Sequence, residues 1–393
     1  MRSILLLQHS QSQYEVIPRM VEQLQQGLEQ MGARVAISDC SSYEQLFSDV
    51  EKHNPDCTWS INIAVEEDLF YIPLGIPHVY LSVDAMTHCC PEFLKMNHLI
   101  PLFVDKTSSD LFVSKNHTPS HWFPHAISQT DLDTFRSRPI IPLNDRPYDI
   151  VLMGTCIDHH KEKKRWSSLF LPSIADDFEQ MAERALEEPS FLLHVEVLNF
   201  IESTPSILAM LDAFGIGVWD LVNSVERYMR GLDRERLLRS FPGRTIHLFS
   251  NEQTIPDWVR ALVGPTLLLH KEVPFSDAGD LCSQSRIVLN SMPMIRQGFH
   301  ERLFLALASG ATVVTTQTSA LPSWLENAGA LSYTTSSLAT VSERLHRAKP
   351  HGQEKIFEWL EKNHTWKARL QAVLPKIDSD VQDLRTRWKE NQQ

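Results

Sequence analysis

The sequence lacks the short motifs that mark the commonest nucleotide-dependent and hydrolytic enzymes. No G-x-G-x-x-G follows the first apolar run, where His9-Ser10-Gln11-Ser12 stands instead. Neither G-x-x-x-x-G-K-[ST] nor G-x-S-x-G occurs in the 393 residues. These absences argue against a dinucleotide of the usual Rossmann type, against P-loop phosphoryl transfer and against an α/β-hydrolase nucleophile.

Paired cysteines and long apolar runs are also missing. The six cysteines form no C-x-x-C pair, so in a chain of this length we expect reduced thiols and no zinc site. The N-terminal MRSILLLQHS has four consecutive apolar residues, too few for a signal peptide, and no other stretch approaches the length of a membrane span. The sequence therefore predicts a cytoplasmic protein without a bound metal or a membrane span.

Acidic residues outnumber basic residues in the chain. The chain has 37 Lys and Arg against 49 Asp and Glu, which gives a formal charge of −12. Binding to nucleic acid depends on clustered cations, so no nucleic-acid partner is expected. A small anionic ligand remains compatible with this balance, because it needs only a local positive site. The length and the hydrophobic content of 42% favour two domains, each with its own core.

Apolar runs alternate with amphipathic segments along the first part of the chain. Runs that are apolar throughout, separated by helices, predict a parallel sheet that is covered on both faces. The expected strands are residues 4–8, 34–38, 58–64, 78–83 and 100–104, and the clearest helices between them are residues 17–31 and 43–52.

A second α/β unit is expected to begin after the proline-rich residues 137–149, which we interpret as an interdomain linker. Residues 158–238 are mostly helical in pattern, and strand-like runs resume after them. We therefore predict two Rossmann-like, doubly wound domains with a ligand cleft between them. The expected parts are residues 1–147, residues 148–355 with a helical insertion at about 158–238, and a helical tail at 356–393 that packs back across the domains.

Residues 297–316, QGFHERLFLALASGATVVTT, form a glycine-led turn, an apolar helix and a buried strand. A helix N-terminus exposes unpaired N–H groups and suits an anion. Gly298 would let the backbone approach a diphosphate, and Arg296 and Arg302 would neutralise it. In the alternative interpretation both arginines pair with surface carboxylates, Glu301 included, and Gly298 only makes a turn. The spacing is compatible with both interpretations.

The wider segment IVLNSMPMIRQGFHERLFLALASGATVVTT resembles the C-terminal signature of CgeB-like, spore-maturation-type glycosyltransferases of the GT-B fold. Four further segments agree with that family in order, and only the helical insertion stays unmatched. They are IPHVYLSVD with Asp84, WFPHAIS with His125, RPYDIVLMGT with Gly154, and NHTWKARL with His364, Trp366 and Arg369.

The resemblance implies a metal-independent GT-B hexosyltransferase. A nucleoside-diphosphate sugar, with a UDP-sugar favoured, would bind mainly to the second domain, and the acceptor mainly to the first. The Glu-x7-Glu pattern of many retaining GT-B enzymes is absent, because Gln297 and Leu305 occupy its places, so retaining stereochemistry is not implied. The residues implied for the donor are Gly154, Thr155, Lys271, Asn290, Arg296, Gly298, Phe299, His300, Glu301 and Arg302.

Glycosyl transfer leaves negative charge on the departing diphosphate, and fixed N–H groups with arginine can stabilise it. An inverting enzyme also needs a base near the acceptor. The candidates at strand ends of the first domain are His9, Asp84, His88 and His125, each of which could instead be a capping or loop residue. His300 would contact the diphosphate or the sugar, or would be a neutral first-turn histidine.

Two further motifs have structural interpretations. Asp131-Leu132-Asp133 imitates a metal-binding DxD motif, but its place at a helix start favours N-capping. His364-Thr365-Trp366 is interpreted as packing that ties the tail to the rest of the protein.

The acceptor stays open between a protein, a surface polysaccharide and a small molecule. The alternatives to a glycosyltransferase are a non-transferring GT-B enzyme, such as a nucleotide-sugar epimerase, and a two-lobed sugar-binding or regulatory protein.

Overall fold

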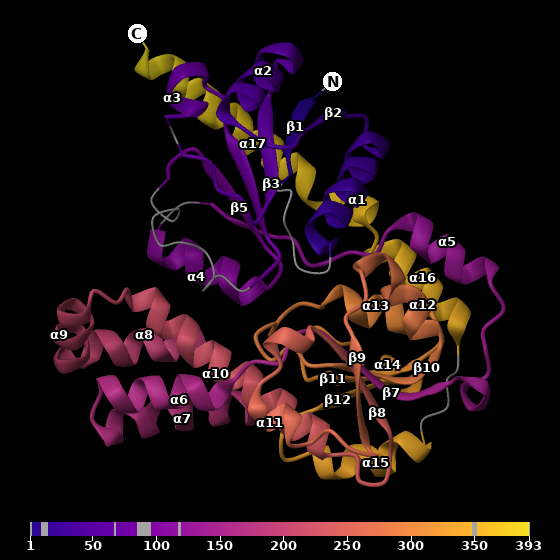
Figure 1. Ribbon diagram of the computed structural model, residues 1–393. Helices are drawn as coiled ribbons and strands as arrows, with labels where there is room; N and C mark the ends of the chain where they lie inside the picture. The colour runs from indigo at the N-terminus through magenta and orange to yellow at the C-terminus, as the bar shows by residue number, and fades with distance from the viewer. Residues whose placement is uncertain are drawn as a thin grey trace. The chain divides into compact units, whose positions relative to one another are not determined.

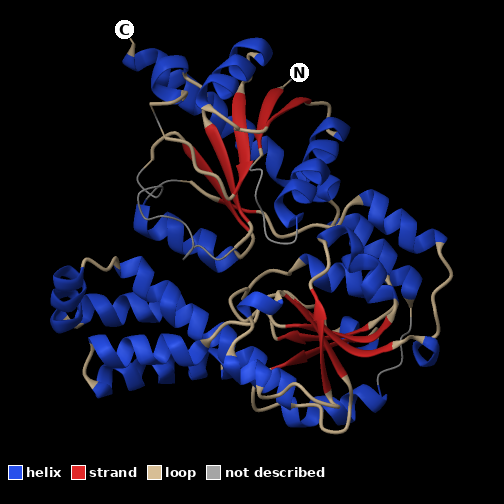
Figure 2. Cartoon of the chain, in the orientation of Figure 1, coloured by secondary structure: helices blue, strands red, loops and turns tan. Residues whose placement is uncertain are grey.

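The computed structural model divides into two compact units. It describes residues 2–8, 15–66, 68–84, 96–116, 119–347 and 352–392. Unit 1 consists of Met1–Asp133, Pro274–Ser276 and Glu358–Gln393, and unit 2 consists of Thr134–Val273 and Asp277–Phe357. Each unit contains one six-stranded parallel sheet with helices around it, as Figure 2 shows.

The sheet of unit 1 has the order β2-β1-β3-β4-β5-β6. Four of its strands, β1, β3, β4 and β5, are buried along their whole length, as expected for a parallel sheet that is covered on both faces. β1 and β5 are apolar runs, whereas β3 and β4 also bury Thr58, Ser60 and His78. The strands are β1 (Ser3–Leu7), β2 (Arg34–Ser38), β3 (Cys57–Ile61), β4 (His78–Ser82), β5 (Leu99–Phe103) and β6 (His121–Trp122).

The C-terminal helix α17 (Trp366–Asn391) is part of unit 1. It packs on α1 (Val16–Gln30) at Gly27, where a Cβ atom would lie only 2.8 Å from Cδ1 of Leu370. Gly27 therefore sets how closely the two helices approach. The other helices of the unit are α2 (Tyr43–His53), α3 (Tyr71–Leu74) and α4 (Lys106–Asn116), and two helices cross the division between the units, α5 (Gln129–Ser137) and α16 (Gln353–Asn363).

The sheet of unit 2 has the order β12-β11-β10-β7-β8-β9. Counted within the unit, this is the Rossmann order 3-2-1-4-5-6, in which the chain direction across the sheet reverses between β7 and β10. The strands are β7 (Tyr148–Met153), β8 (Ile246–Ser250), β9 (Leu267–Lys271), β10 (Ser285–Asn290), β11 (Thr312–Thr316) and β12 (Ala330–Tyr333). The helices near them are α11 (Asp257–Arg260), α12 (Ala278–Ser283), α13 (Glu301–Ala308), α14 (Trp324–Asn327) and α15 (Leu338–Arg347).

Five helices form the predicted insertion, and Figure 1 shows them side by side, away from the sheet of unit 2. A buried polar chain joins three of their side chains: Trp166 Nε1 donates to Ser224 Oγ (2.9 Å), which donates to Glu162 Oε2 (2.6 Å). Among the described residues no single helix has the length and apolar content of a membrane span, although the sharply bent pair α9 and α10 meets those criteria together. The five helices are α6 (His159–Leu169), α7 (Pro172–Glu187), α8 (Leu193–Ser203), α9 (Pro205–Phe214) and α10 (Val218–Arg239).

The proline-rich residues 137–149 do not form a linker. Arg146 is only 2% exposed, and its guanidinium donates to the carbonyl oxygens of Ile141 (3.0 Å), Ser285 (2.8 Å) and Ser309 (2.9 Å). The segment is thereby bound into unit 2, and the division between the units falls earlier, between Asp133 and Thr134. The sequence interpretation was wrong because proline content does not reveal that one arginine in the segment is buried.

Two buried histidines make the stability of unit 1 sensitive to acid. Burial lowers the pKa of His78 to about 3 and that of His364 to about 2, and His78 is neutral among Thr58, Ser60 and the carbonyl of Ile63. In the unfolded chain both groups titrate near pH 6.5, so the unfolded state binds more protons below that pH. Each histidine therefore removes about 1.4 kcal/mol from the free energy of unfolding per pH unit between pH 6.5 and its folded pKa.

We expect His78→Gln to reduce this acid dependence by about 1.4 kcal/mol per pH unit, because a neutral amide replaces the titrating imidazole. Urea unfolding at pH 7, 6 and 5 measures the slope. His160→Gln is the control, since that side chain is 64% exposed. An unchanged slope in the His78 variant would show that another group controls the acid response.

Candidate functional site in the second unit

The carboxyl ends of β7 and β10 lie together at the reversal point of the unit 2 sheet. Gly154 follows β7, and Asn290 ends β10. In open parallel sheets the connections leave such a point toward opposite faces, so a crevice opens there and ligands bind in it. Two residues that the sequence analysis implied for the donor therefore stand at the expected place in the fold.

Gly154 has a backbone conformation that only glycine adopts readily. Its φ is +125°, and its N–H donates to the carbonyl of Phe249 at 3.0 Å. A Cβ atom built on it would lie 3.5 Å from Nη2 of Arg302. The guanidinium of Arg302, which comes from α13, therefore lies beside the end of β7.

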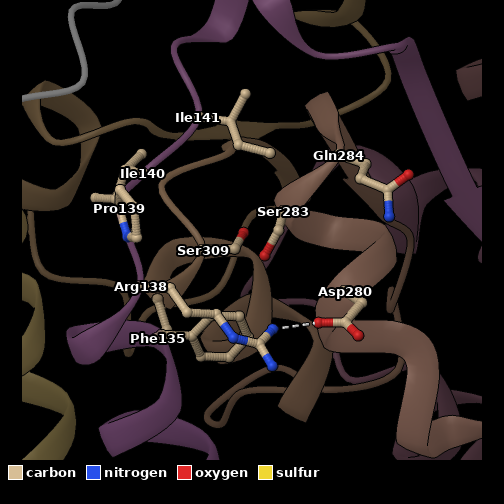
Figure 3. Close-up of a pocket in the computed structure, with 10 residues that line it drawn as sticks. Phe135, Arg138, Pro139, Ile140, Ile141, Asp280, Ser283, Gln284 and Ser309 are labelled. Carbon is tan, nitrogen blue, oxygen red and sulfur yellow. Dashed lines mark hydrogen bonds and ion pairs between the residues drawn. The ribbon is translucent and has the colours of Figure 1, made fainter.

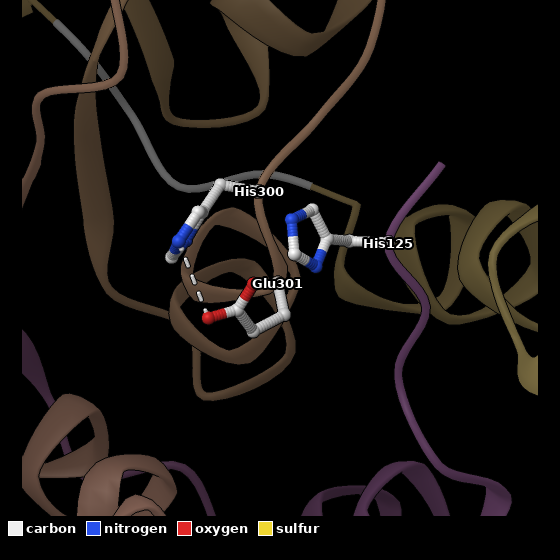
Figure 4. Close-up of side chains that lie close together, drawn as sticks. All are labelled: His125, His300 and Glu301. Atoms are coloured by element: carbon white, nitrogen blue, oxygen red, sulfur yellow. Dashed lines mark ion pairs between the residues drawn. The ribbon is translucent and has the colours of Figure 1, made fainter. Parts of the chain in front are cut away.

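His300 caps the N-terminus of α13. Its Nδ1 accepts a hydrogen bond from the backbone N–H of Arg302 (3.3 Å), so Nδ1 carries no proton. The other ring nitrogen, Nε2, lies 3.3 Å from Oε1 of Glu301, whose side chain is buried (Figure 4). The apolar helix α13 begins with polar residues because His300 caps its first turn and Glu301 is paired with His300.

The turn before α13 is fixed by the loop that follows β11. Thr318 Oγ1 donates to the carbonyl of Arg296 (2.8 Å) and to that of Gly298 (3.3 Å), and the N–H of Ser319 also donates to the Arg296 carbonyl (3.2 Å). Phe299 is buried and packs on Phe304, with ring centroids 5.7 Å apart. Carbonyl oxygens that would repel an anion are thus held by donors within the protein.

Arg296 has a different environment from Arg302. It is 6% exposed, and its Nη2 donates to the Ala185 carbonyl at the end of α7 (2.7 Å). Its guanidinium therefore holds the turn against the helical insertion. The surface-pairing interpretation does not describe Arg296, because its side chain is buried and donates to a backbone carbonyl of the insertion.

A buried carboxylate that the sequence analysis missed lies next to this turn. Asp233 on α10 accepts hydrogen bonds from Ser291 Oγ (2.5 Å) and from the hydroxyl of Tyr333 (2.9 Å). These two bonds connect the carboxyl ends of β10 and β12 through the carboxylate. Burial raises the pKa of Asp233, and the hydrogen bonds and nearby Arg234 and Arg296 oppose that rise. Nothing in the sequence around Asp233 distinguishes it from the exposed acids of an amphipathic helix.

Three other implied donor residues have distinct surroundings. Asn290 is 2% exposed; its Nδ2 donates to Thr315 Oγ1 (3.0 Å), and its Oδ1 has no hydrogen-bond partner among the described residues. Thr155 is half-buried after Gly154, and Lys271 is exposed at the end of β9. All three lie at the carboxyl edge of the sheet, where the fold presents side chains to a ligand.

The candidate bases belong to unit 1. His9 and His88 lie outside the described residues. Asp84 is half-buried after β4, and its Oδ2 accepts from Nδ2 of Asn62 (2.9 Å), which follows β3 in a left-handed conformation (φ 57°). His125 follows β6 and is 4% exposed. Asn62 was missed because its role depends on contact with a residue in another strand connection.

The DxD-like motif lies at the start of α5, as expected, where Asp131 is bonded to the residue that caps the helix. Ser128 Oγ accepts from the N–H of Asp131 (2.9 Å) and donates to Asp131 Oδ2 (2.5 Å) at the start of α5. Ser128 is therefore the cap residue, and the carboxylate of Asp131, which also accepts from Nε2 of Gln23 (3.0 Å), already has partners within the protein.

A small pocket of about 200 Å³ in unit 2 is lined by residues other than those implied for the donor (Figure 3). Its lining includes Gln284, which directly precedes β10, and Ser309, which lies shortly before β11. Arg138 and Asp280 form an ion pair there at 2.6 Å. The pocket therefore lies at the amino edge of the sheet, opposite to the edge where ligands bind in this fold.

Comparison with known proteins agrees with the arrangement of the two sheets. Residues 231–375 match a protein family described as glycosyl transferase-like. No curated protein matches the chain in sequence.

Several solved structures cover nearly the whole chain at low identity. A glycosyltransferase involved in avilamycin A biosynthesis, AviGT4, has a TM-score of 0.54 at 11% identity and covers 98% of both chains. Sucrose-phosphate synthase from Thermosynechococcus elongatus has a TM-score of 0.52 at 10% identity, covering 96% of this chain and 99% of its own. An α-glucosyltransferase solved with UDP and a 13-mer DNA gives the same score, identity and coverage. These likenesses show the fold, two Rossmann-like domains as in GT-B glycosyltransferases.

Proposed function

We propose that the protein is a metal-independent GT-B glycosyltransferase of the CgeB-like type, which transfers a hexose from a nucleoside-diphosphate sugar to an acceptor. The observation that carries the proposal is the guanidinium of Arg302 beside Gly154, at the reversal point of the unit 2 sheet. The glycosyl transferase-like match over residues 231–375 includes this turn and supports the same assignment.

The turn supplies what the leaving diphosphate requires. The N-terminal turn of α13 offers backbone N–H groups and a partial positive charge, and Arg302 adds a full charge with a fork of donors. Because His300, Thr318 and Ser319 already fix the turn, these groups need little reorganisation when charge develops on the diphosphate. Arg296 and Asp233 act on the donor indirectly, by holding the turn against the insertion and the ends of β10 and β12.

We infer that the reaction needs no metal ion, because Arg302 can neutralise the diphosphate and the DxD-like motif has another role. In many transferases a DxD motif binds a cation that neutralises the diphosphate, but here Asp131 is occupied in a helix cap. Arg302 takes the corresponding task. A UDP-sugar is the favoured donor, and one structural neighbour was solved with UDP.

In unit 1, Asp84 is the favoured base among the described candidates. It stands at a strand end and is oriented by Asn62, whereas His125 is nearly fully buried. The acceptor is a protein, a surface polysaccharide or a small molecule, and the formal charge of −12 argues against a nucleic acid.

A thermal-shift panel of UDP, GDP, dTDP, CDP and their sugars tests the donor site. At a concentration of about 100 times Kd a ligand adds about 2.7 kcal/mol to the free energy of unfolding, which for a protein of this size raises Tm by several degrees. We expect UDP and UDP-sugars to give this shift with the wild type and with Arg286→Ala, and no shift with Arg302→Ala. Arg286 is the matched control because it lies at the amino end of β10.

Three results would contradict parts of the proposal. No shift with any nucleotide would remove the nucleotide-sugar donor and favour a binding or regulatory protein for another ligand. A shift that survives in Arg302→Ala would place the nucleotide elsewhere. Conversion of the donor sugar to its epimer, without transfer of the sugar to an acceptor, would assign a non-transferring enzyme.

A further inference from the structure

A pocket of about 350 Å³ lies within unit 1, where β6, α4 and α17 meet. Three cationic side chains line it: Lys106, Arg369 and Lys376. Two hydroxyl groups, those of Ser109 and Ser120, lie 2.7 Å apart on its wall, and Trp122, which is 39% exposed, also borders it. The fold therefore gathers positive charge, hydroxyl donors and an aromatic surface in one hollow.

Arg369 is the unusual member of this group. Its Nη2 is directed at Nδ1 of the neutral His364, and its guanidinium carbon lies 6.0 Å from the centroid of the Trp122 ring. Its Nε is buried and has no hydrogen-bond partner among the described residues. Burial lowers the pKa of Arg369 to about 9, and no carboxylate is among the causes that would raise it. A buried guanidinium without an acid is unfavourable unless an anion comes to it.

The other charges of the pocket do not supply that anion. Lys106 is paired with Asp110 at 2.6 Å, and His121 is paired with Asp380 at 2.5 Å. Lys376 is exposed and has no ion pair among the described residues. Two cations, Arg369 and Lys376, thus remain without a carboxylate partner beside the same hollow.

We propose that this pocket binds the phosphate group of a small phosphorylated molecule. A phosphate monoester carries close to two negative charges at neutral pH, which matches the two unpaired cations. The guanidinium of Arg369 offers a positive charge and a planar fork of donors, the ammonium of Lys376 offers a flexible charge, and the serine hydroxyls can donate to the remaining oxygens. Trp122 presents an apolar ring to the carbon part of the ligand. All of its residues belong to unit 1, whereas the proposed donor turn belongs to unit 2.

Calorimetric titration of the full chain with inorganic phosphate, glucose 6-phosphate and glucose tests the proposal. The titrations use the Arg302→Ala background, so that phosphate binding at the proposed donor turn does not contribute. We expect phosphate and glucose 6-phosphate to bind and to compete with each other, and glucose alone not to bind. Tighter binding of glucose 6-phosphate would show that the carbon part contributes, and equal binding would show that the phosphate alone is recognised.

Two variants locate the binding. Lys376→Gln is expected to weaken both ligands about tenfold through the loss of one charge-assisted hydrogen bond. It should leave Tm unchanged, because Lys376 is exposed. Arg369→Lys, which keeps the charge but loses the planar fork of donors, should weaken them further. Lys367→Gln is the matched control, since Lys367 is exposed on the same helix and does not line the pocket.

The proposal is overturned if neither phosphate nor glucose 6-phosphate binds in the Arg302→Ala background. It is also overturned if Lys367→Gln weakens binding as much as Lys376→Gln, because general attraction to a basic helix would then be the cause. Either result leaves the nucleotide panel on the wild type unaffected, so the two proposals fail independently.

Discussion

Arg302→Ala is expected to lower the rate of glycosyl transfer by about 10²–10³-fold, which is the effect of losing one fixed donor to developing negative charge. The guanidinium lies beside Gly154 at the reversal point of the sheet, where the proposed diphosphate leaves. Its side chain is half-buried and does not provide the helix cap, which comes from His300, so the turn should persist without it.

The rate is measured as release of nucleoside diphosphate from the donor found in the thermal-shift panel, while the sugar is transferred either to an acceptor or to water. Arg302→Lys should recover part of the activity, because a lysine keeps the charge without the planar fork. Arg286→Ala should retain the wild-type rate. Full activity in Arg302→Ala, with an unchanged Tm, would remove this arginine from the reaction.

Arg146→Met is expected to lower the free energy of unfolding by about 3–5 kcal/mol. The arginine joins the carbonyls of Ile141, Ser285 and Ser309, and its Nη1 also lies 3.4 Å from the Cys282 carbonyl. Methionine fills a similar volume but leaves these buried acceptors unpaired, and each buried unpaired group costs about 1–3 kcal/mol, partly relieved by relaxation.

Urea unfolding followed by tryptophan fluorescence and by circular dichroism would measure this loss. Arg138→Met is the control, because its pair with Asp280 has side chains that are 55% and 61% exposed and should contribute at most about 1 kcal/mol. Equal stability of the two variants would show that the carbonyls around position 146 find other donors.

The sequence was a good guide to strands whose burial is uniform. β1 and β5 are apolar along nearly their whole length, and the pattern placed each to within one residue. β6 is only two residues long, and β12 is four residues long, so neither has enough length to show a pattern. The order of the strands, and hence the reversal point between β7 and β10, appears only from the pairing.

The site was predictable in its sequence-local parts. Gly298 and Arg302 could be singled out because a glycine-led turn precedes an apolar helix in the sequence. What the sequence did not separate is the different environments of Arg296 and Arg302, because this depends on where α7 and β7 lie in space. Asp233 and Asn62 were not predicted for the same reason, because each acts through a partner that is distant along the chain.

The placement of α17 has a consequence for how the protein is made. Residues 366–384 of this helix supply buried side chains to unit 1, among them Trp366, Leu370 and Ile377. The residues of unit 2 end at Phe357. During translation all residues of unit 2 are therefore made before α17. Unit 1 begins earlier along the chain, but its core is complete only after α17 has been made. Until that helix has been made, the nascent first unit exposes the face of α1 around Gly27 that α17 later covers.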